Sequence, residues 1–161
     1  MQYVYRLANI GDLDSIMSMV EDRIQWFKDK DIFQWRLYLK HHPIEEWKKA
    51  IHNGELYVVT LDDEVLGCIQ FQYYDPEFWD NSRNLYIKKL CTRVGTKKLG
   101  QYFIEKAIEK ARHENISKIR LDCTNLNEHL NSIYESYGFH VVKKGFHNRY
   151  TYAYCLREMK L

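Results

Sequence analysis

Two hydrophobic periods alternate along the chain, and they predict its secondary structure. A period of two, as in Ile119, Leu121 and Cys123, is typical of a half-buried strand. A second strand of this kind is expected at residues 3–7. A period near 3.6 marks one face of a helix and is clear at Leu13, Ile16, Met17, Val20 and Ile24. A further helix begins after Pro43 and ends near Gly54.

The period changes to two after residue 55. Residues 56–61 and 65–74 flank Asp62-Asp63-Glu64, which predicts a hairpin. An extended segment, Leu85–Thr92, then leads through a short loop into another helix. The apolar face of that helix is Leu99, Phe103, Ala107, Ile108 and Ala111.

A strand, a helix and two strands complete the chain. The strand covers residues 118–124, the helix ends at Gly138, and the last strands begin near Phe139 and Tyr150. Because a helix separates the Leu85–Thr92 strand from the next one, these two are expected to be parallel. The predicted order is βααβββαβαββ, with no internal repeat or interdomain linker. We therefore expect one mixed α/β (α+β) domain over residues 1–161.

Composition excludes several classes of protein. A chain of 161 residues with 45% hydrophobic residues can bury a substantial core. The net charge of +2 gives no reason to expect a nucleic-acid or membrane partner. The N-terminus is unlike a signal peptide, and no apolar stretch approaches the roughly 20 residues that span a bilayer. A soluble, cytoplasmic protein is expected.

Cysteines and histidines give no indication of a metal site. His41 and His42 are adjacent and would point apart in any regular structure, and no H-E-x-x-H spacing occurs. The cysteines are far apart in sequence, and each falls in a predicted strand. They are Cys68, Cys91, Cys123 and Cys155. Buried, reduced thiols are the expected state.

The loop at residues 93–100, RVGTKKLG, is a candidate anion site. The first N–H groups of a helix lack partners, and the helix dipole places about half a positive charge there. With Lys97 and Lys98 beside those donors, the loop can hold a pyrophosphate without a metal ion. On the loop alone, an ordinary strand–helix turn with solvated lysines is favoured, because phosphate-loop patterns have many false positives.

A second motif supports the functional interpretation. It is Asn127 followed by Tyr134, Gly138 and Phe139, placed after the fifth predicted strand. With the loop after the fourth strand, it resembles the GCN5-related N-acetyltransferase (GNAT) superfamily over nearly the whole chain. The tryptophans near residues 26–35 and 78–79 are similar to those of a bacterial branch of small-amine or uncharacterised acetyltransferases. The resemblance implies a GNAT-like acyl-CoA N-acyltransferase fold with a central, mostly antiparallel mixed sheet and flanking helices.

The resemblance also implies a function. The cofactor is acetyl-CoA, whose acetyl group passes to a primary amine of a small molecule or peptide by direct attack within a ternary complex. The strand before the loop bonds the pantetheine arm, and the loop amides bind the pyrophosphate. The implied cofactor-binding residues are Leu90, Cys91, Thr92, Gly95, Thr96, Lys97, Lys98, Leu99, Gly100, Asn127 and Tyr134.

The loop departs from the family pattern Gln/Arg-x-x-Gly-x-Gly/Ala. Aligned on Gly100, Gly95 stands where Gln or Arg belongs, and Lys98 stands where the first Gly belongs. A side chain at position 98 costs about 1 kcal/mol or more if φ is positive there, and little if φ is negative. The lysine charge could offset that cost by attracting phosphate. A non-catalytic acyl-CoA-binding module or a regulatory interaction domain therefore remains an alternative.

Acetyl transfer needs a proton for the departing thiolate and a polarised thioester carbonyl. A tyrosine titrates near ~10, so Tyr134 would be protonated and able to donate to sulfur, which makes it the candidate catalytic residue. Asn127 lies seven residues earlier, two helical turns away on the same face. From the residues alone, a core aromatic and a helix cap are favoured. A backbone N–H such as that of Leu90 is expected to polarise the carbonyl, freed by a bulge in its strand.

The general base and the acceptor are less well defined. Asp75, Glu77, Asp80 and Asp122 are near the expected substrate end of the sheet, but each is more typical of a solvated carboxylate, and no base is assigned. Residues 25–42 and 75–81 are expected to shape a partly apolar acceptor site, or to hold loops with aromatic anchors. The candidate substrate-binding residues are Trp26, Trp35 and Trp79. A monomer and a homodimer are both compatible with the sequence.

Overall fold

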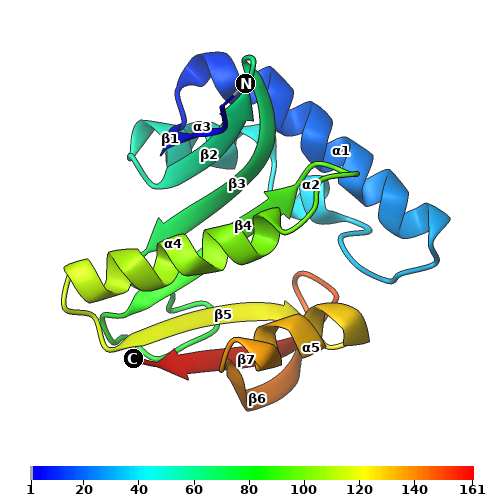
Figure 1. Ribbon diagram of the computed structural model, residues 1–161. Coiled ribbons are helices and arrows are strands. Elements are labelled where there is room, and N and C mark those ends of the chain that lie inside the picture. Colours follow the sequence, from blue (N-terminus) through cyan, green and yellow to red (C-terminus); the bar gives the residue numbers. More distant parts are fainter. Residues whose placement is uncertain (1) are drawn as a thin grey trace. The chain divides into compact units, whose positions relative to one another are not determined.

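The computed structural model describes residues 2–161, which form seven strands, five α-helices and one 3-10 turn (Figure 1). In chain order they are β1 (Val4–Leu7), the 3-10 turn η1 (Ile10–Asp12), α1 (Leu13–Asp29), α2 (Tyr38–His41), α3 (Ile44–His52), β2 (Leu56–Leu61), β3 (Glu64–Gln72), β4 (Leu85–Thr92), α4 (Leu99–His113), β5 (Lys118–Thr124), α5 (Glu128–Ser136), β6 (His140–His147) and β7 (Tyr152–Lys160).

The strands confirm the predicted mixed, mostly antiparallel sheet with flanking helices. The neighbours β1 and β2, β2 and β3, β5 and β7, and β6 and β7 pair in antiparallel fashion. The pair β4 and β5 is parallel, as expected from the helix between them. The chain divides into two compact units, described separately below.

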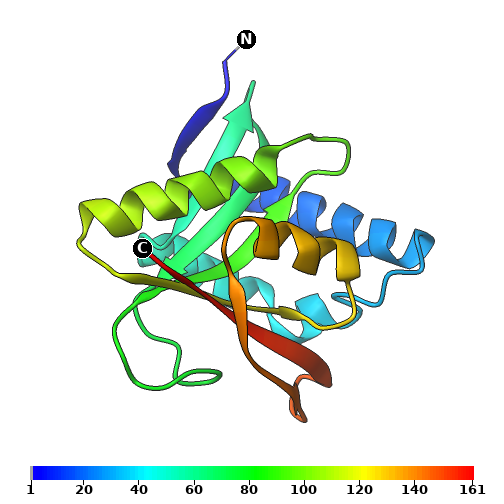
Figure 2. The ribbon, with the colours of Figure 1, turned by 60° about the horizontal axis from the view of Figure 1, so that its bottom comes forward.

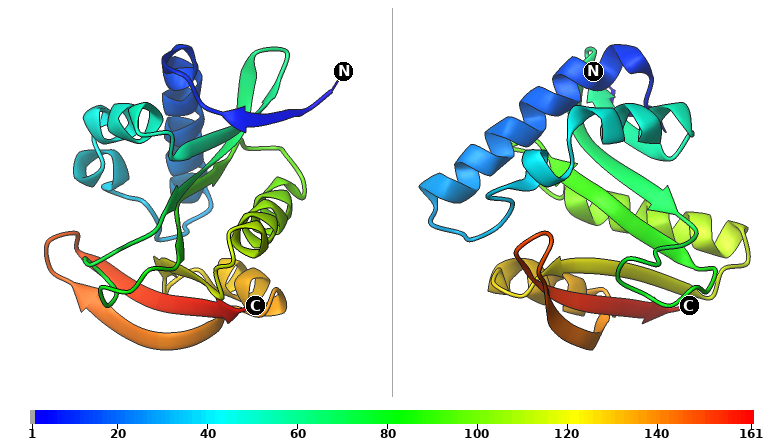
Figure 3. Two further views of the ribbon diagram at one scale, coloured as in Figure 1. Left: turned by 90° about the vertical axis from the view of Figure 1, so that its left-hand side faces the viewer. Right: turned by 180° about the vertical axis from the view of Figure 1, so that it is seen from behind.

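The first unit comprises residues 2–31, 35–70 and 89–103. Here α1 and α3 cover one face of the strands β1-β2-β3 (Figure 3). The helices contribute the apolar stripe that the 3.6-residue period predicts, and the strands contribute alternate residues. The core between them includes Ile16, Met19, Val20, Trp47, Ala50, Leu56, Val58, Val65, Cys68 and Cys91.

The opposite face of β3 receives the first turns of α4. Phe103 is fully buried, and its ring lies over Gly67, where the absence of a side chain makes room for it. Tyr5 on β1 stacks on Tyr57 of β2 with ring centroids 5.3 Å apart, and its ring centroid lies 6.3 Å from that of Phe103. This packing fixes the N-terminus of α4 against the sheet of the first unit.

The second unit comprises residues 32–34, 71–88 and 104–161. Its strands follow the order β4-β5-β7-β6, and β7 lies between β5 and β6 (Figure 2). Arg120 on β5 and Glu158 on β7 are both buried and form an ion pair of 2.7 Å between Nε and Oε2. The buried apolar residues of this unit include Leu85, Ile87, Ile104, Ala107, Ile119, Leu121, Tyr134, Phe139 and Leu156.

Several boundaries differ from the sequence prediction. The first helix continues to Asp29, so Trp26 is helical and does not belong to a long loop. The reason is that Phe27 is buried and extends the apolar stripe by about one more turn. The short helix α2 was not predicted, because four residues carry no periodic signal. The four cysteines are free and buried, as expected.

Among residues 2–161, no helix is long and apolar enough to cross a membrane. The same residues contain no group of three or more His, Cys, Asp or Glu side chains that could hold a metal ion.

Replacing Gly67 with alanine tests the packing of α4 on β3. The added methyl would lie 2.6 Å from Cε2 of Phe103 and 3.0 Å from Cδ2 of Leu99, so the helix or the ring must shift. We expect Gly67→Ala to lower the free energy of unfolding by about 1–3 kcal/mol. Urea denaturation measures this. The control is Gly100→Ala, whose methyl meets no described atom within 4 Å and should be neutral or stabilising. Equal stability of the two variants would contradict the packing.

Candidate functional site

The loop between β4 and α4 is a tight turn held by its own backbone. The N–H of Arg93 donates to the carbonyl of Leu66 on β3 at 2.7 Å. The N–H and the hydroxyl of Thr96 both donate to the carbonyl of Arg93, at 3.1 and 2.7 Å. Gly95, which lies between Arg93 and Thr96, has a φ of 94°, and a residue with a side chain would be strained in this conformation. The glycine at this position is therefore needed for the turn itself.

Lys98 precedes α4 with a φ of 61°. The sequence left the sign of this angle open, and the structure shows the costly alternative. Lys97 and Lys98 are both exposed beside the first turn of the helix. A Cβ built on Gly95 or Gly100 meets no described atom within 4 Å, so the space next to the helix N-terminus is open. Open space, unpartnered helical donors and two ammonium groups fit a pyrophosphate.

Two arginines tie this segment to α1 and β3, and sequence reasoning missed both roles. Arg23 on α1 donates through Nε and Nη2 to the carbonyl of Thr92, at 3.0 and 2.9 Å. Arg93 donates to the carbonyls of Val65 and Ser15, at 2.8 and 3.1 Å. Burial lowers the pKa of Arg23 from its usual value. The available signal was that Arg23 falls on the buried stripe of its helix, where a cation needs a partner.

The end of β4 contains an interruption. Lys89 has a φ of 50° within an otherwise extended strand, which indicates the predicted kind of bulge. The three residues that follow are Leu90, Cys91 and Thr92. Leu90 is half-buried, and burial raises the pKa of the Cys91 thiol to about 12, so this thiol is protonated and unreactive at neutral pH. The Thr92 carbonyl is occupied by Arg23.

In the second unit, Asn127 and Tyr134 belong to the same helix. Asn127 is the N-cap of α5: its Oδ1 accepts from the N–H of Leu130 at 3.0 Å, and its Nδ2 donates to Oε1 of Gln34 at 2.7 Å. Tyr134 is 7% exposed, and its ring packs against Phe139 at 5.8 Å. Burial, with smaller contributions from Cys123 and Asp122, raises the pKa of Tyr134 well above its ordinary value. The phenol therefore keeps its proton at neutral pH.

The four candidate carboxylates all have cationic or histidine partners. Lys88 on β4 places its Nζ 2.5 Å from Asp75 and 2.7 Å from Asp122. Burial opposes the charge of Lys88, but the two carboxylates outweigh it and raise the pKa of the ammonium. Asp80 lies 3.0 Å from Arg120, and Glu77 lies 2.9 Å from Nε2 of the His147 ring. The solvated state expected of Asp75 and Asp122 is thus wrong, since both are ion-paired and mostly buried.

The three candidate tryptophans all pack against neighbours. The guanidinium of Arg23 lies 4.8 Å from the Trp26 ring. Trp35 has a φ of 58°, and its ring stacks on Tyr38 at 4.4 Å. In the second unit, the Arg120 guanidinium lies 4.5 Å from the Trp79 ring. These contacts are typical of aromatic anchors that hold loops to the core, which is the alternative that the sequence analysis gives to substrate binding.

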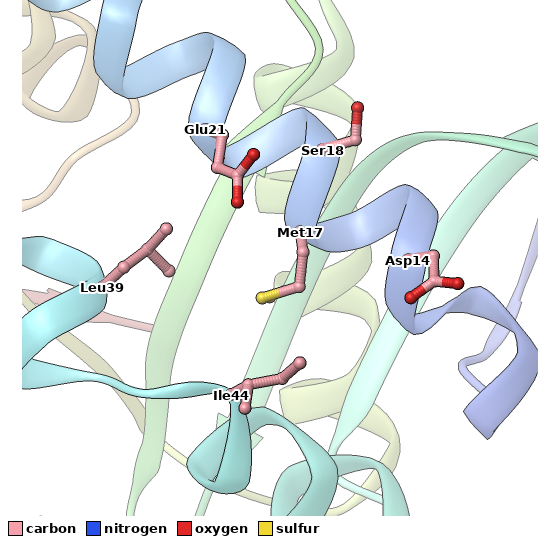
Figure 4. Close-up of a pocket in the computed structure, with 6 residues that line it drawn as sticks. All are labelled: Asp14, Met17, Ser18, Glu21, Leu39 and Ile44. Atoms are coloured by element: carbon pink, nitrogen blue, oxygen red, sulfur yellow. The ribbon is translucent and has the colours of Figure 1, made fainter.

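A cavity of about 320 Å³ lies in the first unit between α1 and the segment that contains α2 and the start of α3 (Figure 4). Met17, Leu39 and Ile44 point into it, with acidic side chains along α1. Its lining is Asp14, Met17, Ser18, Glu21, Leu39 and Ile44. None of these is an individually named candidate residue, but Leu39 belongs to the segment 25–42 that is expected to shape the acceptor site.

Comparisons with known proteins identify the family of this chain. The Acetyltransferase (GNAT) family matches residues 20–139. An uncharacterized N-acetyltransferase of Bacillus subtilis, YesJ, is 25% identical over 138 residues, which cover 80% of this chain and 76% of that protein.

Solved structures show the same fold. An acetyltransferase of the GNAT family from Listeria monocytogenes superposes with a TM-score of 0.79 at 21% identity, covering 99% of this chain and 95% of that one. The PaiA N-acetyltransferase of Thermoplasma acidophilum, solved in complex with coenzyme A, gives a TM-score of 0.78 at 17% identity and covers all of both chains. With three quarters of its length matched by the family, this chain belongs to the GNAT acetyltransferases, whose cofactor is acetyl-CoA.

Proposed function

We propose that the protein transfers the acetyl group of acetyl-CoA to a primary amine of a small molecule or peptide. The observation that carries the proposal is the loop before α4, where two lysines flank an open helix N-terminus. Backbone N–H groups of residues 95–100 would bind the pyrophosphate, and Leu90–Thr92 would bond the pantetheine arm. Acetyl-CoA supplies the activated acetyl group.

The residues of this chain would act on the proton and on the carbonyl. Tyr134 would donate a proton to the departing sulfur, because its raised pKa keeps the phenol protonated. Asn127, at the N-terminus of the same helix, would contact the extended cofactor through its amide. The bulge at Lys89 supports the assignment of Leu90 N–H as the group that polarises the thioester carbonyl. Trp26, Trp35 and Trp79 would contribute apolar surface for the acceptor.

Lys98→Gly separates backbone strain from phosphate attraction in the loop. Glycine adopts the positive φ at position 98 without strain, so we expect this variant to be more stable by about 1 kcal/mol. Losing the ammonium should weaken coenzyme A binding, which calorimetry measures at low and high salt. A matched control is Lys97→Gly, which removes a charge at a position without the strained φ. Unchanged stability of Lys98→Gly would contradict the strain.

Tyr134→Phe tests the proton donor. The variant keeps the ring that packs on Phe139 but lacks the hydroxyl, so the leaving thiolate receives no proton from it. We expect turnover to fall by about 100-fold with acetyl-CoA affinity retained, as measured by thiol release across a panel of primary amines. In the wild type, the raised pKa predicts that the rate does not decline until the pH is above the ordinary tyrosine value of ~10. Undiminished turnover in Tyr134→Phe would show that the proton comes from elsewhere.

The altered loop favours one second candidate, a non-catalytic acyl-CoA-binding module. Its supporting observation is the strained lysine at position 98, where the family has glycine. The two functions differ in one result. The module predicts saturable coenzyme A binding without thiol release for any amine of the panel, whereas the transferase predicts both.

A further inference from the structure

Lys89 combines a strained backbone with a buried charge. Its φ of 50° is unusual for a residue with a Cβ. The hydrogen bonds of a strand do not stabilise this conformation, because a regular ladder needs extended backbone. Its side chain is only 7% exposed, which is rare for a lysine. Such a conformation persists only where the surroundings determine it. The contacts of Lys89 within the first unit show what does so.

The ammonium of Lys89 is held by α3. Its Nζ lies 2.6 Å from Oε2 of Glu46 and 5.3 Å from the centroid of the Trp47 ring. The same Glu46 oxygen lies 2.8 Å from Nδ1 of His42. Burial of Glu46 opposes its charge, but His42 and Lys89 outweigh burial and lower the pKa of the carboxyl to about 2. Glu46 is therefore an anion at any pH at which the protein would work.

The backbone of Lys89 is held from the sheet. Its carbonyl accepts a hydrogen bond from the Cys68 thiol on β3, with Sγ and O 3.2 Å apart. Burial raises the pKa of that thiol, so it remains a donor. Side chain and carbonyl are thus anchored to two different elements. This fixes the peptide group between Lys89 and Leu90 at the angle that the bulge gives it.

We infer that Glu46, with His42 behind it, positions the Leu90 N–H for the acetyl carbonyl by clamping Lys89. The inference rests on the proposed function. A left-handed residue in a strand turns the following peptide out of the regular ladder, so the Leu90 N–H takes a direction that the strand alone would not give. A donor that polarises a carbonyl must be fixed before the reaction. Glu46 and His42 are positioning residues, since they act through Lys89 and not on the substrate.

The test uses acetyl-CoA labelled with carbon-13 at the thioester carbonyl, which needs no knowledge of the acceptor. A hydrogen bond to the carbonyl oxygen moves its carbon-13 resonance downfield of the value in water. The variants are Glu46→Gln and Lys89→Met, which remove one charge each at little change of size. The matched control is Glu45→Gln, one residue away on α3, where the carboxylate is 76% exposed and pairs only loosely with Lys48 at 3.3 Å.

We expect wild type and Glu45→Gln to show the same downfield shift on binding, and both clamp variants to lose most of it. The affinity of both clamp variants for acetyl-CoA should stay within about threefold of wild type, because the loop proposed to bind the pyrophosphate is unchanged. Retained binding would also show that the variants are folded. A full shift in Glu46→Gln and Lys89→Met would overturn the inference and leave the proposed function standing. Failure of the wild type to bind acetyl-CoA would overturn the proposed function, and the inference with it.

Discussion

Left-handed backbone at the end of β4 and in the loop before α4 is the constraint on which the candidate cofactor site depends. Within ten residues the chain adopts a positive φ at Lys89, Gly95 and Lys98, and only one of these residues is glycine. Each lysine in this conformation costs stability that burial or hydrogen bonds must offset. The two lysines differ in these stabilising contacts. Lys89 is anchored by Glu46 and Cys68, whereas the Lys98 side chain is exposed.

The two arginines explain why the loop keeps its shape despite this strain. Arg23 and Arg93 donate to carbonyls before and beside the loop, so the backbone that precedes Gly95 is tied to α1 and β3. These guanidinium groups therefore serve the scaffold, and in the proposed function Lys97, Lys98 and the helix N–H groups would bind the anion. The family has Gln or Arg at the position of Gly95. In this chain Gly95 has a φ of 94°, which favours glycine over a residue with a side chain, and Lys97 and Lys98 carry the exposed positive charges of the loop.

Periodicity was sufficient to predict the main elements, because the core of the first unit is built from regular apolar stripes such as that of α1. It placed the parallel pair and the loop before α4 correctly in the chain order. It could not reveal the contacts that shape the loop, because these join residues far apart in the sequence. Arg23 binds the carbonyl of Thr92, 69 residues later, and Arg93 binds that of Ser15, 78 residues earlier. Nor could it give the sign of φ at Lys98, which depends on how the turn closes in three dimensions.

The charges of the second unit favour giving a proton over taking one. Burial, with smaller contributions from nearby groups that include Asp122, raises the pKa of Tyr134 and of Tyr152, so these hydroxyls keep their protons. Asp122 itself shares Lys88 with Asp75, and Asp80 is bound to Arg120. Hydrogen bonds from Ser82 and Arg120 lower the pKa of Asp80, so this carboxylate is a weaker base than a free aspartate. In the proposed reaction, we therefore assign the proton lost by the attacking amine to water and not to Asp80, while Asp75 and Asp122 keep their ion pairs with Lys88.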